Sequence, residues 1–346
     1  MTKISRRDFL KLGGASLGSL AFTPSLNHLF DFDDSNMVRV ATTSVSVHSE
    51  PDDQSRIVST WMRDELVHVY GEVTAPTPTY NPVWYRVWGG YMHRARLQRV
   101  KTIYNQTLPT LEDGTRRLVE ITVPYTQPWR YTKIYNWQQL GFRLYYGSVH
   151  WVEAIEPGPF GEQWYRIYDD LTGFPYYVNP LHIRPIPLSE LAPITPEIPL
   201  EKKRIEVNLT TQTLTAYEYD KQVFKTTICS GIPGGPRGAN GIKTKTPDGE
   251  FRIQDKMPAK HMGNGNLFAD VDDYELPGVP WTSFFTSQGH AFHGTYWHEN
   301  FGVPMSHGCI NMRTEEAKWL FLWVLPPHEI GKTYNRGYGT LVQIHY

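Results

Sequence analysis

A motif that occurs twice limits the folds open to this chain more than any other feature of its sequence. Residues 84–88 read Trp-Tyr-Arg-Val-Trp, and residues 164–168 read Trp-Tyr-Arg-Ile-Tyr. A tyrosine follows each copy, and an aliphatic residue comes six positions after each tyrosine. Self-similarity of this kind indicates two copies of one small structural unit. Because short runs rich in aromatic and β-branched residues are typical of strands, both units are predicted to be β modules.

The first copy lies in residues 37–101, a segment that resembles a bacterial SH3-like barrel. Short apolar or alternating runs, separated by turn sequences rich in Pro, Asp and Gly, predict strands at 38–41, 45–48, 66–70 and 84–88. We refer to this segment as the first module.

The second copy lies in residues 116–187, which we expect to form a second SH3-like module. Strands are predicted at 118–123 and 149–154. A stretch rich in Trp and Tyr, residues 125–144, lies between them and is longer than its counterpart in the first module. We refer to residues 116–187 as the second module.

The N-terminus has the pattern of an export signal. Arg6 and Arg7 stand in a basic stretch that is followed by a Gly-rich, mildly apolar run, residues 12–22. This order is typical of a twin-arginine signal. The apolar run is shorter than the roughly 20 residues that a membrane span needs. Residues 1–34 are therefore predicted to direct export to the cell envelope, and to contact the membrane only if the signal stays uncleaved.

Charge and cysteine content exclude two classes of protein. Lys plus Arg number 34 and Asp plus Glu 35, so no excess of positive charge points to nucleic acid. Two cysteines cannot build a disulfide framework, and Cys229 is expected to be a small buried thiol. Residues 188–201 belong to a proline-rich stretch, which predicts a stiff, extended linker before the last domain.

The second cysteine, Cys309, stands in the run Ser-His-Gly-Cys-Ile-Asn, with a further His-Gly pair upstream at His293 and Gly294. A thiol becomes a good nucleophile when a base removes its proton, and two imidazoles are offered here, at His293 and His307. The amides of Gly308 and Cys309 are placed to hold an oxyanion. The spacing of the histidines between 290 and 307 fits no zinc signature, so no metal is expected.

His293-Gly294 together with residues 306–311 resembles the signature of the L,D-transpeptidase (YkuD) family of bacterial cell-wall enzymes. The resemblance extends from about residue 202 to the C-terminus. It implies a β-sandwich or mixed-sheet catalytic domain over residues 202–346 with a short bracing helix. The whole chain is therefore expected to be mainly β, with two small barrels before the catalytic domain.

Within that domain, alternating patterns predict strands at 204–209, 213–219, 223–231, 246–253 and 340–345. A helix is predicted to begin with a Thr314 cap, to bury one face that includes Ala317 and Leu320, and to end at Pro326. By position in the family, residues 256–280 are expected to form a lid or substrate wall. Residues 232–245 are expected to be a loop near the cleft.

The resemblance also implies a role for each motif residue. Cys309 would be the nucleophile, His293 the proton donor and acceptor, and Gly294 the residue whose carbonyl orients that imidazole. His307 would support the site, and Gly308 would supply an oxyanion amide. Residues expected to contact substrate are Ser306, Asn311, Arg313 and Tyr296. No cofactor is implied.

The reaction implied is formation of a peptidoglycan cross-link through a thioester acyl-enzyme, with release of a terminal D-alanine. The partners would be a donor tetrapeptide stem and an amine acceptor. Two alternatives keep the same acyl-enzyme: hydrolysis, as in an L,D-carboxypeptidase, and attachment of a protein to the wall. A non-enzymatic wall-binding protein with an inactive domain is a further alternative. The two modules either hold peptidoglycan near the site or serve as spacers and packing partners.

Overall fold

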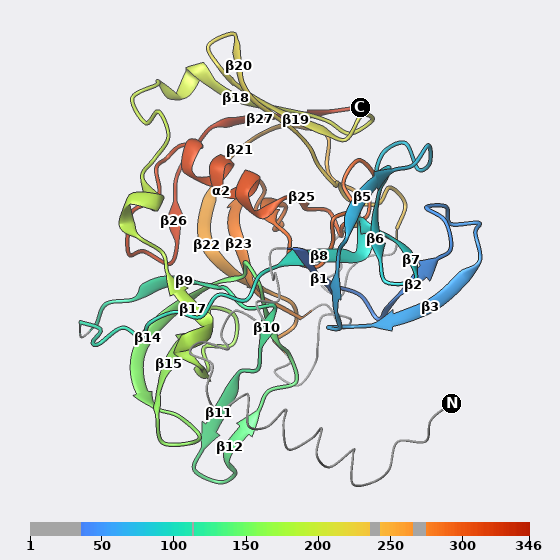
Figure 1. Cartoon of the computed structure of the whole chain (residues 1–346). Helices are drawn as coiled ribbons and strands as arrows, with labels where there is room; N and C mark the ends of the chain where they lie inside the picture. Colours follow the sequence, from blue (N-terminus) through green and yellow to red (C-terminus); the bar gives the residue numbers. More distant parts are fainter. Residues whose placement is uncertain (1–35, 113, 236–242, 266–274) are drawn as a thin grey trace, which may run out of the picture. The chain divides into compact units, whose positions relative to one another are not determined.

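The computed structural model describes residues 36–112, 114–235, 243–265 and 275–346. The predicted export signal lies outside these residues. Asn36–Tyr346 forms one compact unit. The described chain is mainly β, and its α-helix is α2 (Thr314–Trp323) (Figure 1). No helix among the described residues has the length and apolar character needed to cross a membrane.

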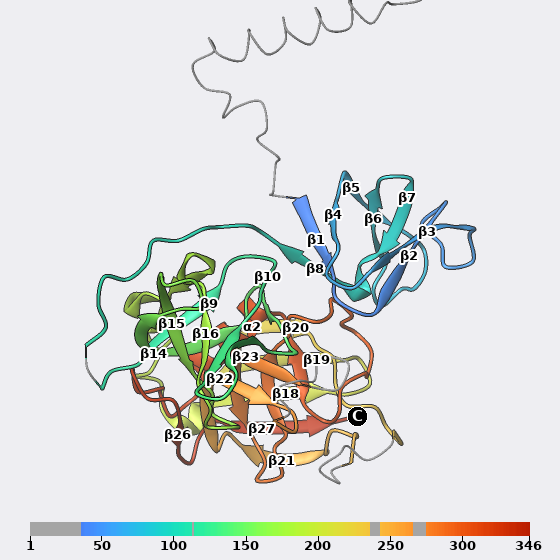
Figure 2. The same ribbon diagram turned by 90° about the horizontal axis from the view of Figure 1, so that it is seen from below.

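The first module folds into two antiparallel sheets (Figure 2). One has the order β4 (Leu66–His68), β1 (Met37–Val40), β8 (Leu97–Val100). The other has the order β3 (Ile57–Met62), β2 (Ser44–His48), β7 (Gly90–His93), β6 (Val83–Val87), β5 (Gly71–Thr74). In β6 the repeated motif buries Trp84 and Tyr85 and leaves Arg86 exposed.

The second module is built on one seven-stranded sheet. Its order is β12 (Asn136–Gln139), β11 (Trp129–Thr132), β16 (Tyr176–Val178), β15 (Gln163–Tyr168), β14 (Val149–Pro157), β9 (Arg117–Ile121), β17 (Ile183–Pro185). A two-stranded sheet joins β10 (Tyr125–Thr126) and β13 (Leu144–Tyr145). The inserted stretch therefore supplies four strands, and β15 buries Trp164 and Tyr165 as β6 buries its own pair.

The proline-rich stretch after the second module differs from the extended linker that was expected. It contains two 3₁₀ turns, Leu188–Leu191 and Leu200–Lys202. Leu191 is buried in the core of the C-terminal region, and the Ile194 N–H donates to Leu322 O at 2.9 Å. The stretch packs because its apolar side chains find buried partners that composition alone does not reveal.

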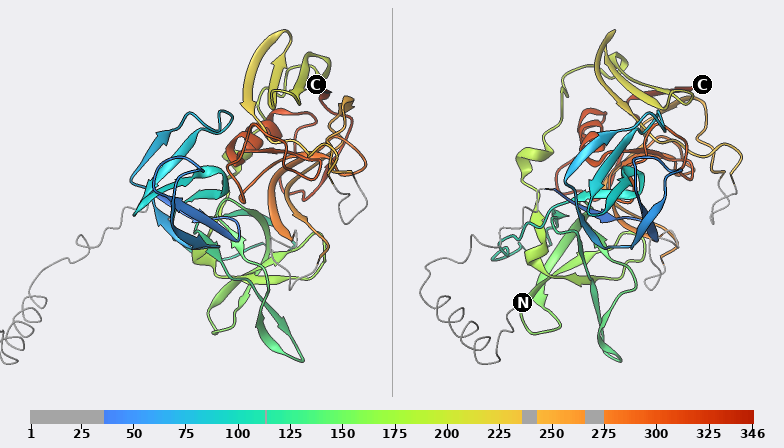
Figure 3. Two further views of the ribbon diagram at one scale, coloured as in Figure 1. Left: turned by 90° about the vertical axis from the view of Figure 1, so that its right-hand side faces the viewer. Right: turned by 45° about the vertical axis from the view of Figure 1, so that its right-hand side comes forward.

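The C-terminal region contains two five-stranded sheets (Figures 1 and 3). One has the order β20 (Lys221–Thr227), β19 (Thr213–Glu218), β18 (Lys203–Asn208), β27 (Leu341–His345), β21 (Gly249–Arg252). The other has the order β25 (Ile310–Met312), β24 (Ala291–Gly294), β23 (Leu276–Phe284), β22 (Asp255–Met262), β26 (Asn335–Arg336).

The strand predicted at 340–345 is β27, which lies between β18, with which it pairs in parallel, and β21, with which it pairs antiparallel. The stretch expected to form a lid contains most of β22 and the first half of β23, and its residues 266–274 lie outside the described residues. Long-range pairing places these strands, and neither pairing could be inferred from local pattern.

Two buried lysines donate hydrogen bonds to the backbone carbonyls at the C-terminal end of α2. Lys203 Nζ donates to Trp323 O at 2.9 Å, and Lys256 Nζ donates to Val324 O at 3.0 Å and Pro326 O at 3.1 Å. The last carbonyls of a helix have no partner within the helix, and cations are favoured there. At the other end Thr314 is the first helical residue rather than the cap, and its hydroxyl donates to Thr295 O at 3.3 Å.

Candidate active site

A parallel pair of short strands carries the two principal residues of the motif. In the register of β24 and β25, His293 is paired with Asn311. Cys309 lies in the bend immediately before β25, two residues before Asn311. The pairing therefore places the turn that carries Cys309 at the start of the strand that lies next to His293.

One hydrogen bond determines the tautomer of His293. Its Nδ1 lies 3.0 Å from Gly294 O, and because a carbonyl only accepts, Nδ1 carries the proton. The Nε2 atom is then an unprotonated acceptor, and it has no hydrogen-bond partner among the described residues. Burial lowers the pKa of the imidazole to about 4, while the bond to Gly294 opposes that shift. His293 is therefore neutral at pH 7.

The thiol of Cys309 is held by backbone groups of residues 289–291. Its Sγ donates to Gly289 O at 3.6 Å, and the Ala291 N–H bonds to the sulfur. Burial raises the pKa of Cys309 to about 11, and the Ala291 N–H opposes the rise. Among the described residues no hydrogen bond joins the sulfur to His293. The resting site thus holds a neutral thiol at Cys309 and a neutral imidazole at His293.

Gly308 permits the turn that carries the nucleophile. Its φ is +118°, and a Cβ there would lie 3.0 Å from Cδ2 of His290 and 3.3 Å from Lys243 O. Gly231 approaches from the other side, where a Cβ would lie 2.7 Å from the Gly308 Cα. A side chain at either glycine would be strained or would displace the turn.

Ser306 braces the same turn through its side chain. Its hydroxyl donates to Cys309 O, and it accepts the Gly308 N–H at 3.1 Å. Its backbone also pairs with a neighbouring segment, because the Ser306 N–H donates to Ser230 O at 3.0 Å. The Gly308 amide, predicted to hold an oxyanion, is therefore already occupied in this conformation. Ser306 is buried, as expected of a residue that holds the loop.

Asn311 connects the site to a buried histidine that the sequence did not single out. Its Nδ2 lies 3.0 Å from His298 Nε2, and its backbone exchanges hydrogen bonds with Cys229 at 2.8 and 3.0 Å. Burial lowers the pKa of His298 to about 3, and the charge of Arg96 acts in the same direction. Cys229 is a free, fully buried thiol whose pKa burial raises to about 12.

The remaining predicted site residues lie in three different environments. His307 is exposed on the nucleophile turn. Arg313 lies over the ring of Phe301, with its Nε 3.8 Å from Glu299 Oε2. Tyr296 is 1% exposed, and its hydroxyl donates to Pro277 O at 2.9 Å. A substrate contact does not fit that burial, so Tyr296 is better described as a packing residue.

His290 is a second histidine of the site that sequence reasoning did not assign. Thr286 Oγ1 accepts its backbone N–H at 3.1 Å and lies 2.9 Å from its Nδ1. If the hydroxyl donates to Nδ1, the ring carries its own proton on Nε2. This Nε2 is buried without a partner, and the ring lies against Gly308. Burial lowers the pKa of His290, so the ring beside the nucleophile turn is neutral.

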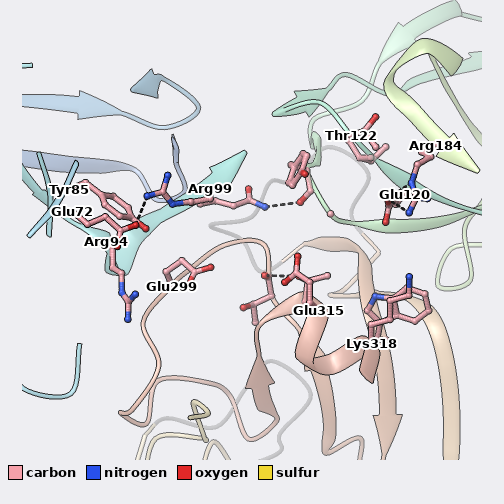
Figure 4. Close-up of a pocket in the computed structure, with 17 residues that line it drawn as sticks. Glu72, Tyr85, Arg94, Arg99, Glu120, Thr122, Arg184, Glu299, Glu315 and Lys318 are labelled. Atoms are coloured by element: carbon pink, nitrogen blue, oxygen red, sulfur yellow. Dashed lines mark hydrogen bonds and ion pairs between the residues drawn. The ribbon is translucent and has the colours of Figure 1, made fainter. Parts of the chain in front are cut away.

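A separate pocket of about 510 Å³ lies where the two modules and the C-terminal region meet (Figure 4). Neither Cys309 nor His293 lines it. Its charged side chains include Arg94 and Arg99, Glu120 and Arg184, Glu299 and Lys318. Several are already paired, as Arg184 is with Glu120 at 2.6 Å. Among the described residues, no group of three or more His, Cys, Asp or Glu side chains could hold a metal ion.

Residues 202–344 match the model of the YkuD family, which is described as the L,D-transpeptidase catalytic domain. These residues form a YkuD domain. The YkuD domain contains the β24–β25 pair, the nucleophile turn and α2. The resemblance read from residues 293–294 and 306–311 is thereby confirmed at the level of the family.

Solved L,D-transpeptidases are similar over part of the chain. One from Stackebrandtia nassauensis is 24% identical over 42% of this chain and 56% of its own, with a TM-score of 0.29. One from Mycobacterium smegmatis is 21% identical over 42% and 59%, with a TM-score of 0.32. The catalytic domain of the enzyme from E. faecium is 26% identical over 42% and 98%, with a TM-score of 0.29. The chain thus covers less than two thirds of the first two. No curated protein matches it.

Proposed function

We propose that the YkuD domain transfers acyl groups between peptidoglycan stem peptides in the cell envelope, with Cys309 as nucleophile and His293 as general base. The observation that carries this proposal is the tautomer of His293. Its Nδ1–H is committed to Gly294 O at 3.0 Å, so the lone pair of Nε2 is available to take the proton of Cys309, which lies just before the strand paired with β24. A carbonyl takes the place that an acidic residue holds in other triads.

The pKa values define what must happen before bond formation. With the thiol pKa raised to about 11 and the imidazole pKa lowered to about 4, no thiolate–imidazolium pair exists in the resting site. The thiol must leave Gly289 O and present its proton to His293 Nε2. Bound substrate then supplies the electrophile as the proton moves, which is general-base assistance rather than a preformed thiolate.

The chemical steps balance without a cofactor. Cys309 Sγ attacks the carbonyl that precedes the terminal D-alanine, and its proton passes to His293. The tetrahedral intermediate collapses, the C–N bond breaks, and His293 returns the proton to the departing amine. A thioester remains on Cys309. An amine of a second stem then attacks the thioester, gives its proton to His293, and releases the thiolate, which recovers that proton.

The oxyanion needs donors that are free when it forms. Because the Gly308 N–H already donates to Ser306 Oγ at 3.1 Å, we assign the role to the Cys309 N–H and to the Nε2–H of His290. The imidazole donor is buried, neutral and unpartnered, so it costs no reorganisation when charge develops beside it.

Three variants assayed with a disaccharide-tetrapeptide and an amine acceptor test the proposal. Cys309→Ala should release no D-alanine, and His293→Gln should lower kcat by about 10²- to 10⁴-fold, the usual contribution of a general base. His307→Gln is the matched control on the exposed side of the turn, and it should retain most activity. Cross-linking or D-alanine release by Cys309→Ala would refute the mechanism.

The same assay separates the alternatives that share this acyl-enzyme. A cross-linked dimer indicates transfer, and a free tripeptide indicates L,D-carboxypeptidase activity. A wall peptide joined to an added protein indicates attachment. Mass spectrometry of the products distinguishes all three outcomes.

A further inference from the structure

The segment between the proposed base and the proposed nucleophile is held from outside the YkuD domain. Residues 295–309 connect β24, which carries His293, to the turn of Cys309. We call them the crossover loop. The first module contacts this loop at Tyr296, Glu299, Asn300 and Gly302.

Asn81 makes the most complete of these contacts. It is 0% exposed, and its Nδ2 donates to Glu299 O at 3.0 Å and to Asn300 Oδ1 at 3.2 Å. Its Oδ1 accepts Arg94 Nε at 2.5 Å, and its carbonyl bonds to His93 Nε2 at 2.7 Å. Both amide hydrogens and both oxygens are thus used. A buried amide satisfied on every side specifies one arrangement of its neighbours.

Three further contacts surround Asn81. The Glu299 N–H donates to Ala95 O at 2.9 Å, and the buried Arg39 donates from Nη2 to Tyr296 O at 2.9 Å. Gly302 has a φ of +96°, and a Cβ there would lie 3.1 Å from Tyr80 O. The first module therefore holds the loop backbone at both ends of residues 296–302.

The far side of the loop leads to the reaction site. The Asn300 N–H donates to His298 Nδ1 at 3.1 Å, so the neutral ring carries its proton on Nε2. The side-chain amide of Asn311 lies 3.0 Å from this Nε2 and accepts its proton when the amide oxygen faces the ring. Asn311 is the residue paired with His293 in the strand register. Asn300 also donates from Nδ2 to Met305 Sδ at 3.3 Å, next to Ser306. Contacts thus run without a break from Asn81 to the strand that presents the nucleophile.

We propose that Asn81 is a positioning residue for the Cys309–His293 site, and that the first module sets the geometry of the crossover loop. This inference rests on the proposed function, because it assigns Asn81 a role in that reaction. Asn81 touches no reacting atom; it acts through the loop. Displacing a catalytic group by about 1 Å can lower a rate by about 10²-fold, so the contact bears on kcat.

The substitution Asn81→Asp tests the contact selectively. Aspartate keeps the oxygen that accepts Arg94 Nε, so the hydrogen bond inside the first module is retained and gains an opposite charge. It replaces the two N–H donors with an anion that faces Glu299 O and Asn300 Oδ1. The change therefore repels the loop while the module stays intact.

Asn105→Asp is the matched control. The Asn105 Nδ2 also bonds to neighbouring groups, Thr122 Oγ1 at 2.6 Å and Ile103 O at 3.2 Å, but these lie away from the crossover loop. Iodoacetamide labelling followed by mass spectrometry measures the fraction of molecules with an intact Cys309 thiol. Each kcat is then expressed per intact site. Cys229 is fully buried and should not be labelled in the folded protein.

We expect Asn81→Asp to lower kcat for D-alanine release by about 10- to 100-fold, with KM changed less than about three-fold. Asn105→Asp should match the parent protein in both. Unchanged kcat in Asn81→Asp would overturn the positioning role, as would a raised KM at unchanged kcat, which would instead indicate that the first module contacts substrate. Failure of the proposed function is recognised separately, because Cys309→Ala would then remain active.

Discussion

The first and second modules share the repeated motif, but they contact the YkuD domain with different chemistry. The first module meets the crossover loop mainly through amide and carbonyl groups, as at Asn81 and Ala95. The second module shares an apolar core with the YkuD domain through Leu118, Val149 and Trp151, and it adds charged contacts at β22. The Asp169 carboxylate lies 2.6 Å from the ring nitrogen Nδ1 of His261. The Asp170 carboxylate accepts a hydrogen bond from the backbone N–H of His261 at 2.8 Å. The two modules thus contact the YkuD domain through unlike groups.

The charged contact of the second module is deeply buried. His261, Asp169 and Glu275 are each at most 2% exposed. Glu275 Oε1 lies 2.8 Å from His261 Nε2, in a geometry that makes no hydrogen bond. Glu275 also accepts the N–H groups of Asn264 and Gly265. A contact between buried charged groups is costly to break, because each partner is left buried and unpaired. Neutral amide hydrogen bonds mainly fix geometry. We therefore expect the contact of the second module to affect the free energy of unfolding most, and that of the first module to affect kcat most.

The largest expected effect breaks the charged contact. His261→Leu leaves two buried carboxylates without their shared partner, and removing one member of a buried ionic group costs about 3–5 kcal/mol. Urea unfolding should show this loss, while kcat of the folded fraction changes little. His345→Leu, at an exposed position of β27, is the control and should change stability by less than about 0.5 kcal/mol. A loss below about 1 kcal/mol in His261→Leu would contradict the comparison.

A smaller effect is expected at the one buried charge of the first module that reaches the loop. Arg39 donates to Asp64, Gln98 and Tyr296 O. Arg39→Met retains an apolar stem but leaves these acceptors short of a donor, which should cost about 2–3 kcal/mol by urea unfolding. Asp64 keeps its ion pair with Arg143, so the loss should stay below that of His261→Leu. Arg86→Met, at the exposed arginine of the motif, should be nearly neutral.

The site itself should show opposite pH slopes for its two main groups. His293 has a pKa lowered from 6.5 to about 4, so its contribution to stability is present above pH 6.5 and is lost as pH falls through 4. Cys309 has a pKa raised from 9.0 to about 11, so its contribution is present below pH 9 and is lost as pH rises through 11.

Urea unfolding of the parent protein and two variants between pH 4 and 11 checks these slopes. His293→Gln should flatten the acid side, and Cys309→Ser should flatten the alkaline side. Iodoacetamide labelling of Cys309 should accelerate with a midpoint near pH 11, well above that of a free thiol. A midpoint near pH 7 would mean that a thiolate forms in the resting site, contrary to the mechanism above.

The smallest effect is expected in the polar pocket between the regions. Arg99 pairs there with Glu72, and their side chains are 38% and 54% exposed. Ion pairs so open to solvent contribute at most about 1 kcal/mol. Arg99→Ala should therefore shift the free energy of unfolding by less than about 1 kcal/mol, and less again at high salt. A larger loss would show that this pocket, rather than the two contacts above, holds the modules in place.

Local pattern predicted much of the secondary structure. The alternation in residues 204–209 and 213–219 corresponds to β18 and β19, and the spacing of Ala317 and Leu320 to the buried face of α2. The strand β22 was missed because that stretch had been assigned to a lid. Thr314 was predicted to cap α2, but it is the first helical residue. Its hydroxyl donates to Thr295 O, a residue distant in sequence, and local pattern does not reveal that contact.

The sequence by itself predicted the family of the C-terminal domain and a candidate nucleophile and base, because the motifs that contain Cys309 and His293 are local. Tertiary structure alone decided that His290 lies against the nucleophile turn, that His298 reaches Asn311, and that Asn81 reaches the crossover loop. Those outcomes depend on burial and on hydrogen bonds between residues far apart in the chain. Such bonds form only after the strands have paired, so no local pattern records them.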